Sequence, residues 1–234
     1  MLSPFGLFYN PTYLLFMLPA ILLMLAAQWY VRSAYAKWSR VPARSGFTGA
    51  QAAQRLMQSA GLYDVQLEGV PGNMTDHYDP RNKVLRLSPG VARGQSVAAL
   101  AIAAHELGHA MQDKEGYLPL RLRGALVPAV NIGSYLGWIF ILIGLLINAT
   151  GLAMLGLIIF SGGAVFALAT LPVEFNASAR AKRLLVNSGL IRGEDELRGV
   201  NAVLNAAALT YVAALVTAVL QLLYYASLVF GRRR

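Results

Sequence analysis

The chain has 234 residues, of which 56% are hydrophobic and only 13% carry a charged side chain. Soluble globular domains are about one quarter charged, so this composition excludes an ordinary soluble protein and favours a membrane protein. The absence of cysteine excludes disulfides and cysteine-based metal sites, and the net charge of +9 requires no nucleic acid, because basic residues beside membrane spans bind anionic lipid headgroups.

Four uncharged apolar runs are long enough to cross a bilayer as helices. They cover Tyr13–Val31, Leu126–Ile147, Leu152–Leu171 and Ala202–Phe230. The first run is longer than the apolar core of a cleaved signal peptide and no Lys or Arg precedes it, so it is interpreted as an anchor. The second and third runs are separated by a very short polar link, which predicts a helical hairpin.

The segment Ser45–Arg123 is the part of the chain that looks like a soluble domain. Thr48 is a suitable N-cap for a helix from Gly49 to Ala60. Alternating apolar and polar residues predict half-buried strands at Asp64–Val70 and Lys83–Ser88. Because so short a segment buries little apolar surface alone, we expect it to pack against the membrane helices and the segment that follows the third span.

The most specific motif of the chain is the HExxH sequence at His105–His109. Ser96 can cap a helix over Val97–Met111, which is rich in good helix formers. Two imidazoles four residues apart leave the same helix face, so they can offer two ligands to one Zn²⁺, while Glu106 can accept a proton from water. An interior glycine, Gly108, indicates that another element packs close to the metal.

A catalytic zinc site usually takes three protein ligands and leaves one position for water. Glu174 is the preferred third ligand, because the hairpin of two spans returns the chain to the side of the motif. A buried carboxylate at a membrane boundary also needs a cationic partner. We expect Glu174 to start a helix at the end of the third span. His77 is the alternative ligand, or a group that polarises a substrate carbonyl or stabilises an oxyanion.

The basic residues predict how the spans are oriented. Of the 20 Lys and Arg, 12 lie between Arg32 and Arg123 and five between Arg180 and Arg198. Four spans place both segments on one side, which the positive-inside rule makes cytoplasmic. The last three arginines, Arg232–Arg234, oppose this orientation, so either they are tolerated on the far side or the last run is a re-entrant or interfacial element.

Three segments together resemble the YugP-like family of bacterial membrane-bound neutral zinc metallopeptidases. These segments are DHYDPRNKVLRLS at 76–88, HELGHAMQD at 105–113 and LPVEFNAS at 171–178. The similarity extends over nearly the whole chain, and the chain is more distantly similar to HtpX-like proteases and CaaX endopeptidases. In those relatives the gluzincin pattern is HExxH followed downstream by ExxxD.

The resemblance implies that His105, His109 and Glu174 bind one zinc ion and that Glu106 is the catalytic base. The chain departs from the ExxxD pattern, because the position four residues after Glu174 is a serine. The aspartate that would orient a histidine is therefore absent or replaced, and Asn176 and Ser178 are the two candidates for its replacement.

The expected fold class is a mostly α, polytopic membrane protein with about four transmembrane helices and a small α+β, gluzincin-like zinc-protease domain built from a helix, a strand hairpin and the HExxH helix. The expected organisation is an anchor at 1–31, the protease domain at 32–125, a membrane hairpin at 126–171, the third-ligand segment at 172–200 and a final span at 201–234. The expected location is the bacterial inner membrane, multi-pass, with the site facing the cytoplasm.

These features predict a zinc-dependent metalloendopeptidase that hydrolyses peptide bonds of membrane or membrane-proximal proteins, with protein or peptide substrates and the lipid bilayer as partners. An edge strand formed by Val84, Leu85, Arg86 and Leu87 would pair with an extended substrate. The alternative is a non-catalytic, zinc-containing membrane scaffold or assembly factor, whose site would be closed by four protein ligands. Intramembrane cleavage is disfavoured because no LDG segment follows the motif, and a transporter because paired broken helices are missing.

Overall fold

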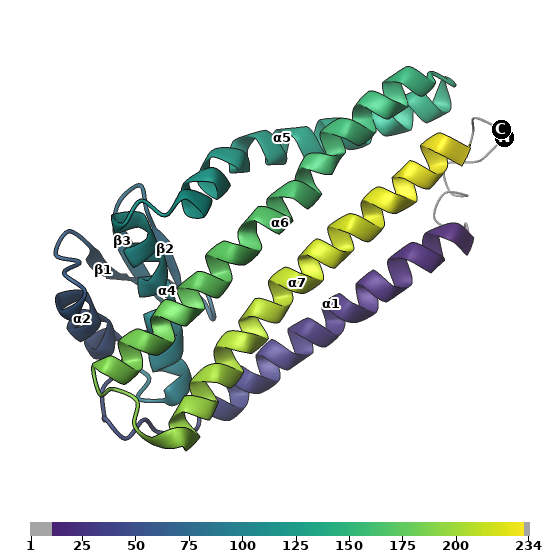
Figure 1. Cartoon of the computed structure of the whole chain (residues 1–234). Helices are drawn as coiled ribbons and strands as arrows, with labels where there is room; N and C mark the ends of the chain where they lie inside the picture. Colours follow the sequence, from purple (N-terminus) through teal and green to yellow (C-terminus); the bar gives the residue numbers. More distant parts are fainter. Residues whose placement is uncertain (1–10, 232–234) are drawn as a thin grey trace. The chain divides into compact units, whose positions relative to one another are not determined.

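A computed structural model describes residues 11–231 of the chain, so the arginines at 232–234 lie outside the described residues. The chain divides into two units (Figure 1). Among the described residues, the helical unit comprises 11–28, Leu122–Leu171 and 210–231, and the mixed unit comprises Trp29–Arg121 and Pro172–Leu209.

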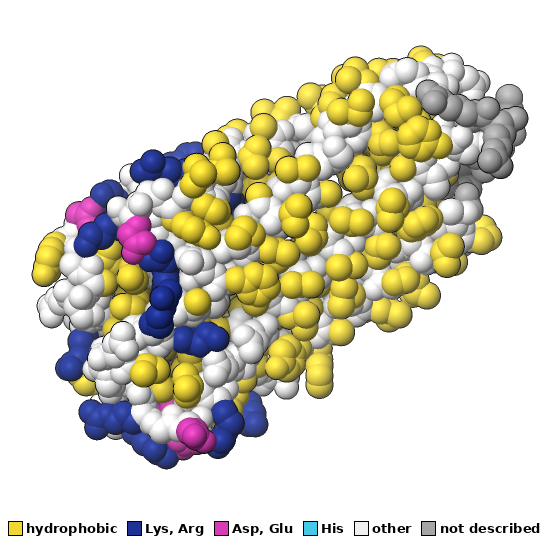
Figure 2. All heavy atoms as spheres, viewed as in Figure 1, with side chains coloured by type: hydrophobic (Ala, Val, Ile, Leu, Met, Phe, Trp, Pro, Cys, Tyr) yellow, Lys and Arg dark blue, Asp and Glu magenta, His cyan; other side chains and the backbone are white. Residues whose placement is uncertain are grey.

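The helical unit is built from parts of four long apolar helices, each of which continues into the mixed unit. Within residues 11–231, four helices are long and apolar enough to cross a membrane: α1 (Pro11–Trp38), α5 (Leu118–Leu146), α6 (Thr150–Asn187) and α7 (Gly193–Gly231). Hydrophobic side chains cover the visible face of these helices, whereas Lys and Arg gather over the mixed unit (Figure 2). The mostly helical class and the four predicted apolar spans are therefore confirmed.

The predicted hairpin of α5 and α6 is tightly packed through glycines. A Cβ atom on Gly137, Gly144 or Gly156 would fall closer than 3.0 Å to backbone atoms of the facing helix. The turn between the two helices contains Asn148 in the left-handed region, at a φ of 57°. Small residues at such positions allow helix backbones to approach closely in a membrane, where apolar side chains gain little from leaving lipid.

After the end of α1, the mixed unit continues with a helix whose first turn is specified by its own sequence. Helix α2 (Gly49–Ser59) begins with a capping box, in which Thr48 accepts a hydrogen bond from the Gln51 amide and the Gln51 side chain accepts one from the Thr48 amide. This reciprocal pairing satisfies two backbone donors that the first turn leaves open. Three short strands, β1 (Gln66–Gly69), β2 (His77–Asp79) and β3 (Val84–Leu87), precede α3 (Pro89–Ala92) and α4 (Val97–Lys114).

The sheet has the order β1-β3-β2, which corrects two predictions. The two predicted strands, β1 and β3, pair in parallel rather than as a hairpin, and the antiparallel partner of β3 is the additional strand β2. Consequently Val84, Leu85, Arg86 and Leu87 form the central strand and not an edge, because both backbone edges of β3 are already paired. Strand β2 is only three residues long, too short for an alternating pattern to reveal it.

The mixed unit gains its core from distant segments of the chain. Fully or almost fully buried side chains from α2, β3, α4, α6 and α7 form one cluster, which includes Leu56, Leu85, Leu87, Leu100, Leu107, Leu185 and Leu204. The prediction that the short domain packs against the segment after the third span is thus confirmed. Each buried leucine of this kind contributes about 1.5–3 kcal/mol through removal of apolar surface from water.

Helix α6 differs from its prediction, because Glu174 does not start a new helix. The helix is continuous from Thr150 to Asn187 and contains Pro172 in its interior. Proline removes one backbone hydrogen bond and normally ends a helix in water. In long apolar helices neighbouring groups compensate for this loss, so proline is tolerated there. The Glu174 side chain therefore extends from a continuous helix.

Candidate metal centre

Helix α4 holds the HExxH motif. Its N-cap, Ser96, accepts a hydrogen bond from the Ala99 amide, as the sequence predicts. The first half of the helix is almost entirely buried and rich in alanine, which fixes the helix within the core of the mixed unit. The rings of His105 and His109 leave the same face one turn apart, with their centroids separated by 4.9 Å.

Glu174 of α6 lies beside both imidazoles. Its Oε2 atom is 3.3 Å from Nε2 of His105 and 3.6 Å from Nε2 of His109. The carboxylate side chain is only 2% exposed, and the two histidine side chains are 12% and 11% exposed. One ligand atom from each residue lies within 4.8 Å of the other two. The structure therefore brings together the three side chains that the sequence predicts as metal ligands.

This donor set fits a zinc ion. For Zn–N and Zn–O bonds of about 2.0–2.1 Å, two ligand atoms of a tetrahedral site are separated by about 3.3–3.4 Å. The two measured nitrogen–oxygen distances, 3.3 and 3.6 Å, lie close to that separation. Two imidazoles and one carboxylate are also a ligand combination that catalytic zinc sites use. A zinc ion bound there would supply the cation that burial of the Glu174 carboxylate requires.

Gly108 explains how α4 and α6 come close enough for Glu174 to lie beside both imidazoles. A Cβ atom at this position would lie 2.5 Å from the carbonyl oxygen of Ala177 in α6 and 3.0 Å from its Cα. Only glycine leaves room for the α6 backbone at this point. The prediction that another element packs closely at Gly108 is confirmed, and this element is α6, the helix that carries Glu174.

Ser178 occupies the position where the gluzincin pattern has aspartate. Its hydroxyl oxygen is 3.2 Å from Nδ1 of His105. A hydroxyl can accept a hydrogen bond from the ring and so direct the opposite nitrogen, Nε2, toward Glu174. Asn176, the other candidate for the missing aspartate, contacts Gln112 and Arg180 instead of a histidine.

Glu106 is held by a strand that sequence reasoning missed. The backbone amide of Tyr78, in β2, donates a hydrogen bond of 3.1 Å to Oε2 of Glu106. The Tyr78 hydroxyl donates to Oδ2 of Asp113, two turns further along α4, at 2.8 Å. Burial raises the pKa of the Glu106 carboxyl, and the nearby imidazoles of His105 and His109 oppose this increase. A raised pKa is typical of a carboxylate that serves as a general base near neutral pH.

His77 lies apart from the cluster of His105, His109 and Glu174. Its side chain is exposed at the start of β2, and its Nδ1 atom is 2.8 Å from the carbonyl oxygen of Thr75. It is absent from the group of side chains that could hold a metal within the described residues. The geometry therefore favours Glu174 over His77 as the third ligand.

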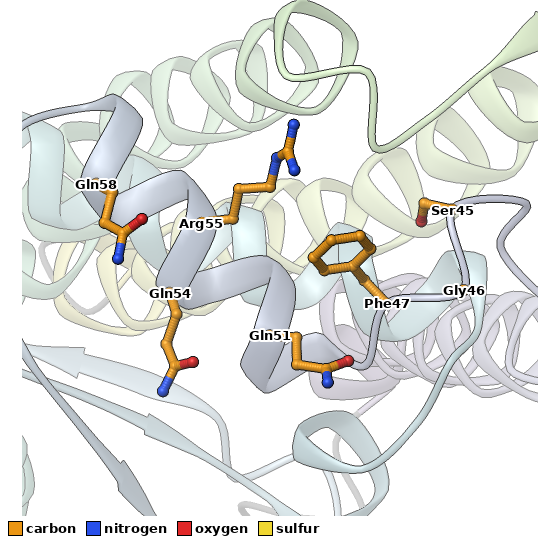
Figure 3. A pocket seen from close by; sticks show the side chains of 7 residues that line it. All are labelled: Ser45, Gly46, Phe47, Gln51, Gln54, Arg55 and Gln58. Carbon is orange, nitrogen blue, oxygen red and sulfur yellow. The ribbon is translucent and has the colours of Figure 1, made fainter.

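A surface pocket elsewhere in the mixed unit has no residue in common with this centre. It has a volume of about 540 Å³ and is lined by residues of α2 and the preceding loop, most of them polar (Figure 3). The lining residues are Ser45, Gly46, Phe47, Gln51, Gln54, Arg55 and Gln58. The guanidinium of Arg55 stacks over the Phe47 ring at 5.6 Å, which stabilises the wall of the pocket.

Comparisons with known proteins agree with the chemistry of the centre. A family model described as "Putative neutral zinc metallopeptidase" matches residues 13–230. The "Putative membrane protease YugP" of Bacillus subtilis (strain 168) is 47% identical over 207 residues, which cover 88% of this chain and 92% of that protein. No solved structure matches the chain. The resemblance drawn from the three sequence segments is thereby confirmed.

Proposed function

The chain belongs to the neutral zinc metallopeptidase family, and from this premise we propose that it is a membrane-bound zinc metalloendopeptidase of the HExxH…E type. The observation that carries the proposal is the convergence of His105, His109 and Glu174 on one buried point beside Glu106. Its substrates are proposed to be membrane or membrane-proximal proteins, because four apolar helices hold the chain in a bilayer.

His105, His109 and Glu174 would hold one zinc ion through Nε2, Nε2 and a carboxylate oxygen. When bound, zinc lowers the pKa of a coordinated water to about 7 and polarises the scissile carbonyl. Glu106 takes a proton from the attacking water and passes it to the leaving amine. The Tyr78 amide orients the Glu106 carboxylate for both transfers, since it binds one of the two carboxylate oxygens.

The substrate backbone is proposed to reach the centre along β2. This strand is at the edge of the sheet, and the backbone amide of Tyr78 on that strand already contacts Glu106. An extended peptide that adds to such an edge is bound through its main chain, so its side chains contribute little to recognition. This mode of binding predicts broad sequence specificity.

The protease is proposed to reside in the bacterial inner membrane with its site facing the cytoplasm. This orientation follows from the 17 Lys and Arg of residues 32–198, which the positive-inside rule places in the cytoplasm. These basic residues are proposed to contact anionic lipid headgroups rather than nucleic acid.

The alternative, a zinc-containing scaffold, requires a site closed by protein ligands. The candidate group in the described part of the chain consists of three side chains, which leaves a tetrahedral position for water. The enzyme is therefore the better supported function.

The test is metal content and cleavage of casein or membrane proteins by the detergent-purified chain, compared with Glu106→Gln. We expect one equivalent of zinc in both proteins and a loss of cleavage of about 10²–10⁴-fold in the variant, which lacks the general base. Chelation should abolish the wild-type activity. Zinc without cleavage in either protein would favour the scaffold, and absence of zinc from the wild type would refute the proposal.

A further inference from the structure

Gln112 lies directly behind one of the two imidazoles. It follows His109 by three residues on α4, so the two side chains share a helix face. Gln112 is completely buried, and its Oε1 atom is 3.0 Å from Nδ1 of His109. The ring nitrogen on the opposite side, Nε2, is the one that faces Glu174.

The orientation of the Gln112 amide is fixed by α6. Its Nε2 atom donates to the carbonyl oxygen of Val173 at 2.8 Å and to Oδ1 of Asn176 at 3.0 Å. Both partners are acceptors, so a flipped amide would place its oxygen against two other oxygens. The Gln112 oxygen must therefore face His109, and it can only accept. The shared hydrogen must then be on Nδ1 of His109, which leaves Nε2 with a free lone pair.

A second contact holds Asn176 in place. The same Oδ1 atom accepts a hydrogen bond of 2.7 Å from Nε of Arg180. The guanidinium of Arg180 also binds both carboxylate oxygens of Glu115, at 2.6 and 2.7 Å, and its side chain is only 12% exposed. A bidentate pair of this kind fixes the plane of the guanidinium. One chain of hydrogen bonds thus extends from a surface ion pair to a buried imidazole.

We propose that Gln112 is a positioning residue that holds His109 in the tautomer with Nε2 free for the metal, and that Asn176 and Arg180 hold Gln112 in the required orientation. The inference rests on the proposed function, because it assumes that His109 binds zinc. The partner behind the ring is a neutral amide, so a glutamate at position 112 is not equivalent. A carboxylate has no N–H to donate, and its second oxygen would face the oxygens of Val173 and Asn176.

The experiment measures zinc affinity of the full chain in detergent by competition with a chromogenic chelator. Gln112→Leu should weaken zinc binding by about 10–100-fold, the usual effect of removing a partner of a metal-bound imidazole, and Gln112→Glu should weaken it as well. Asn176→Leu should also weaken zinc binding, but less than Gln112→Leu does, because the Val173 carbonyl still accepts a hydrogen bond from the Gln112 amide. Asn176→Asp keeps the accepting oxygen for both Gln112 and Arg180, so it should bind zinc as the wild type does.

The melting temperature of each metal-free variant separates positioning from a purely structural role. If Gln112→Leu melts earlier but binds zinc with wild-type affinity, the inference is overturned. The same holds if Asn176→Leu and Asn176→Asp bind zinc equally. If Gln112→Leu does not fold, the comparison of zinc affinity between Asn176→Leu and Asn176→Asp tests the inference. If the wild type itself binds no zinc, the proposed function fails rather than the positioning argument alone.

Discussion

Replacing Gly108 by alanine is expected to separate α4 and α6, the two helices that carry the proposed metal ligands. The added Cβ atom would lie 2.5 Å from the Ala177 carbonyl oxygen. Backbone atoms of α6 occupy that space, so no flexible side chain can move aside. Ordinary contact between such atoms requires about 3.5 Å, and α6 must therefore withdraw by roughly 1 Å or tilt.

Gly108→Ala is expected to change the free energy of unfolding only slightly but to disturb the metal site strongly. Overpacking of a core costs about 1–3 kcal/mol, whereas alanine gains about 1 kcal/mol over glycine in helix propensity. The net loss of stability should therefore be small, at about 0–2 kcal/mol. The spacing of the proposed ligands should be more sensitive to the substitution. Oε2 of Glu174 lies 3.3 and 3.6 Å from the two imidazole nitrogens, and these distances would lengthen if α6 withdrew. An increase of roughly 1 Å exceeds the tolerance of about 0.5 Å for a functional site.

The assay compares the zinc dissociation constant and the melting temperature of Gly108→Ala with those of Gly124→Ala. Gly124 lies within α5, and an added Cβ atom there meets nothing within 4 Å. This control should bind zinc normally and melt at or slightly above the wild-type temperature. Gly108→Ala should bind zinc at least 10-fold more weakly, comparable to the loss of an outer-shell contact. If Gly108→Ala binds zinc like the control, the close approach of α4 and α6 does not set the ligand spacing.

Two further predictions concern the third ligand and the general base. Glu174→Ala should weaken zinc binding by more than about 100-fold, which exceeds the effect of losing a residue that only orients a ligand. His77→Ala should leave the zinc affinity unchanged. If chelator competition gave the reverse result, His77 would replace Glu174 as the third ligand. Tyr78→Phe removes a hydrogen bond to the charged Asp113, worth about 1.5–3 kcal/mol, and loosens the strand whose amide binds Glu106. We expect kcat to fall several-fold with zinc content unchanged, and a loss of zinc instead would show that Tyr78 supports the metal rather than the base.

The relation between local sequence and structure is closest in α4. Two histidines at i and i+4 share one face of any helix, so the HExxH motif predicts the placement of His105 and His109 before the fold is known. The Ser96 and Thr48 caps are similarly local, because each acts within its own first turn. The apolar spans are predictable for another reason. An uninterrupted apolar run in a bilayer must satisfy its backbone hydrogen bonds internally, which leaves the helix as the available structure.

Contacts between distant segments could not be predicted from local sequence and are seen only in the tertiary structure. Glu174 lies 65 residues after His109, and its spacing from the motif contains no geometric information. The sequence favoured Glu174 over His77 as the third ligand, and the packing of α4 on α6 at Gly108 and Ala177 brings Glu174 beside the two imidazoles. The partner of the first imidazole, Ser178, is likewise defined only by that packing.

Strand pairing in the sheet likewise could not be predicted from local sequence. Alternation along the chain predicts β1 and β3 because it reflects burial of one face of each strand. It contains no information on which strands pair, and here a three-residue strand, β2, pairs with β3 on the side opposite β1. Local sequence thus predicted the apolar helices, the Thr48 and Ser96 caps and the common face of His105 and His109, all of which depend on neighbours within a few residues. Strand order, the approach of Glu174 to the two imidazoles and the contact of Ser178 with His105 depend instead on packing between segments far apart in the chain.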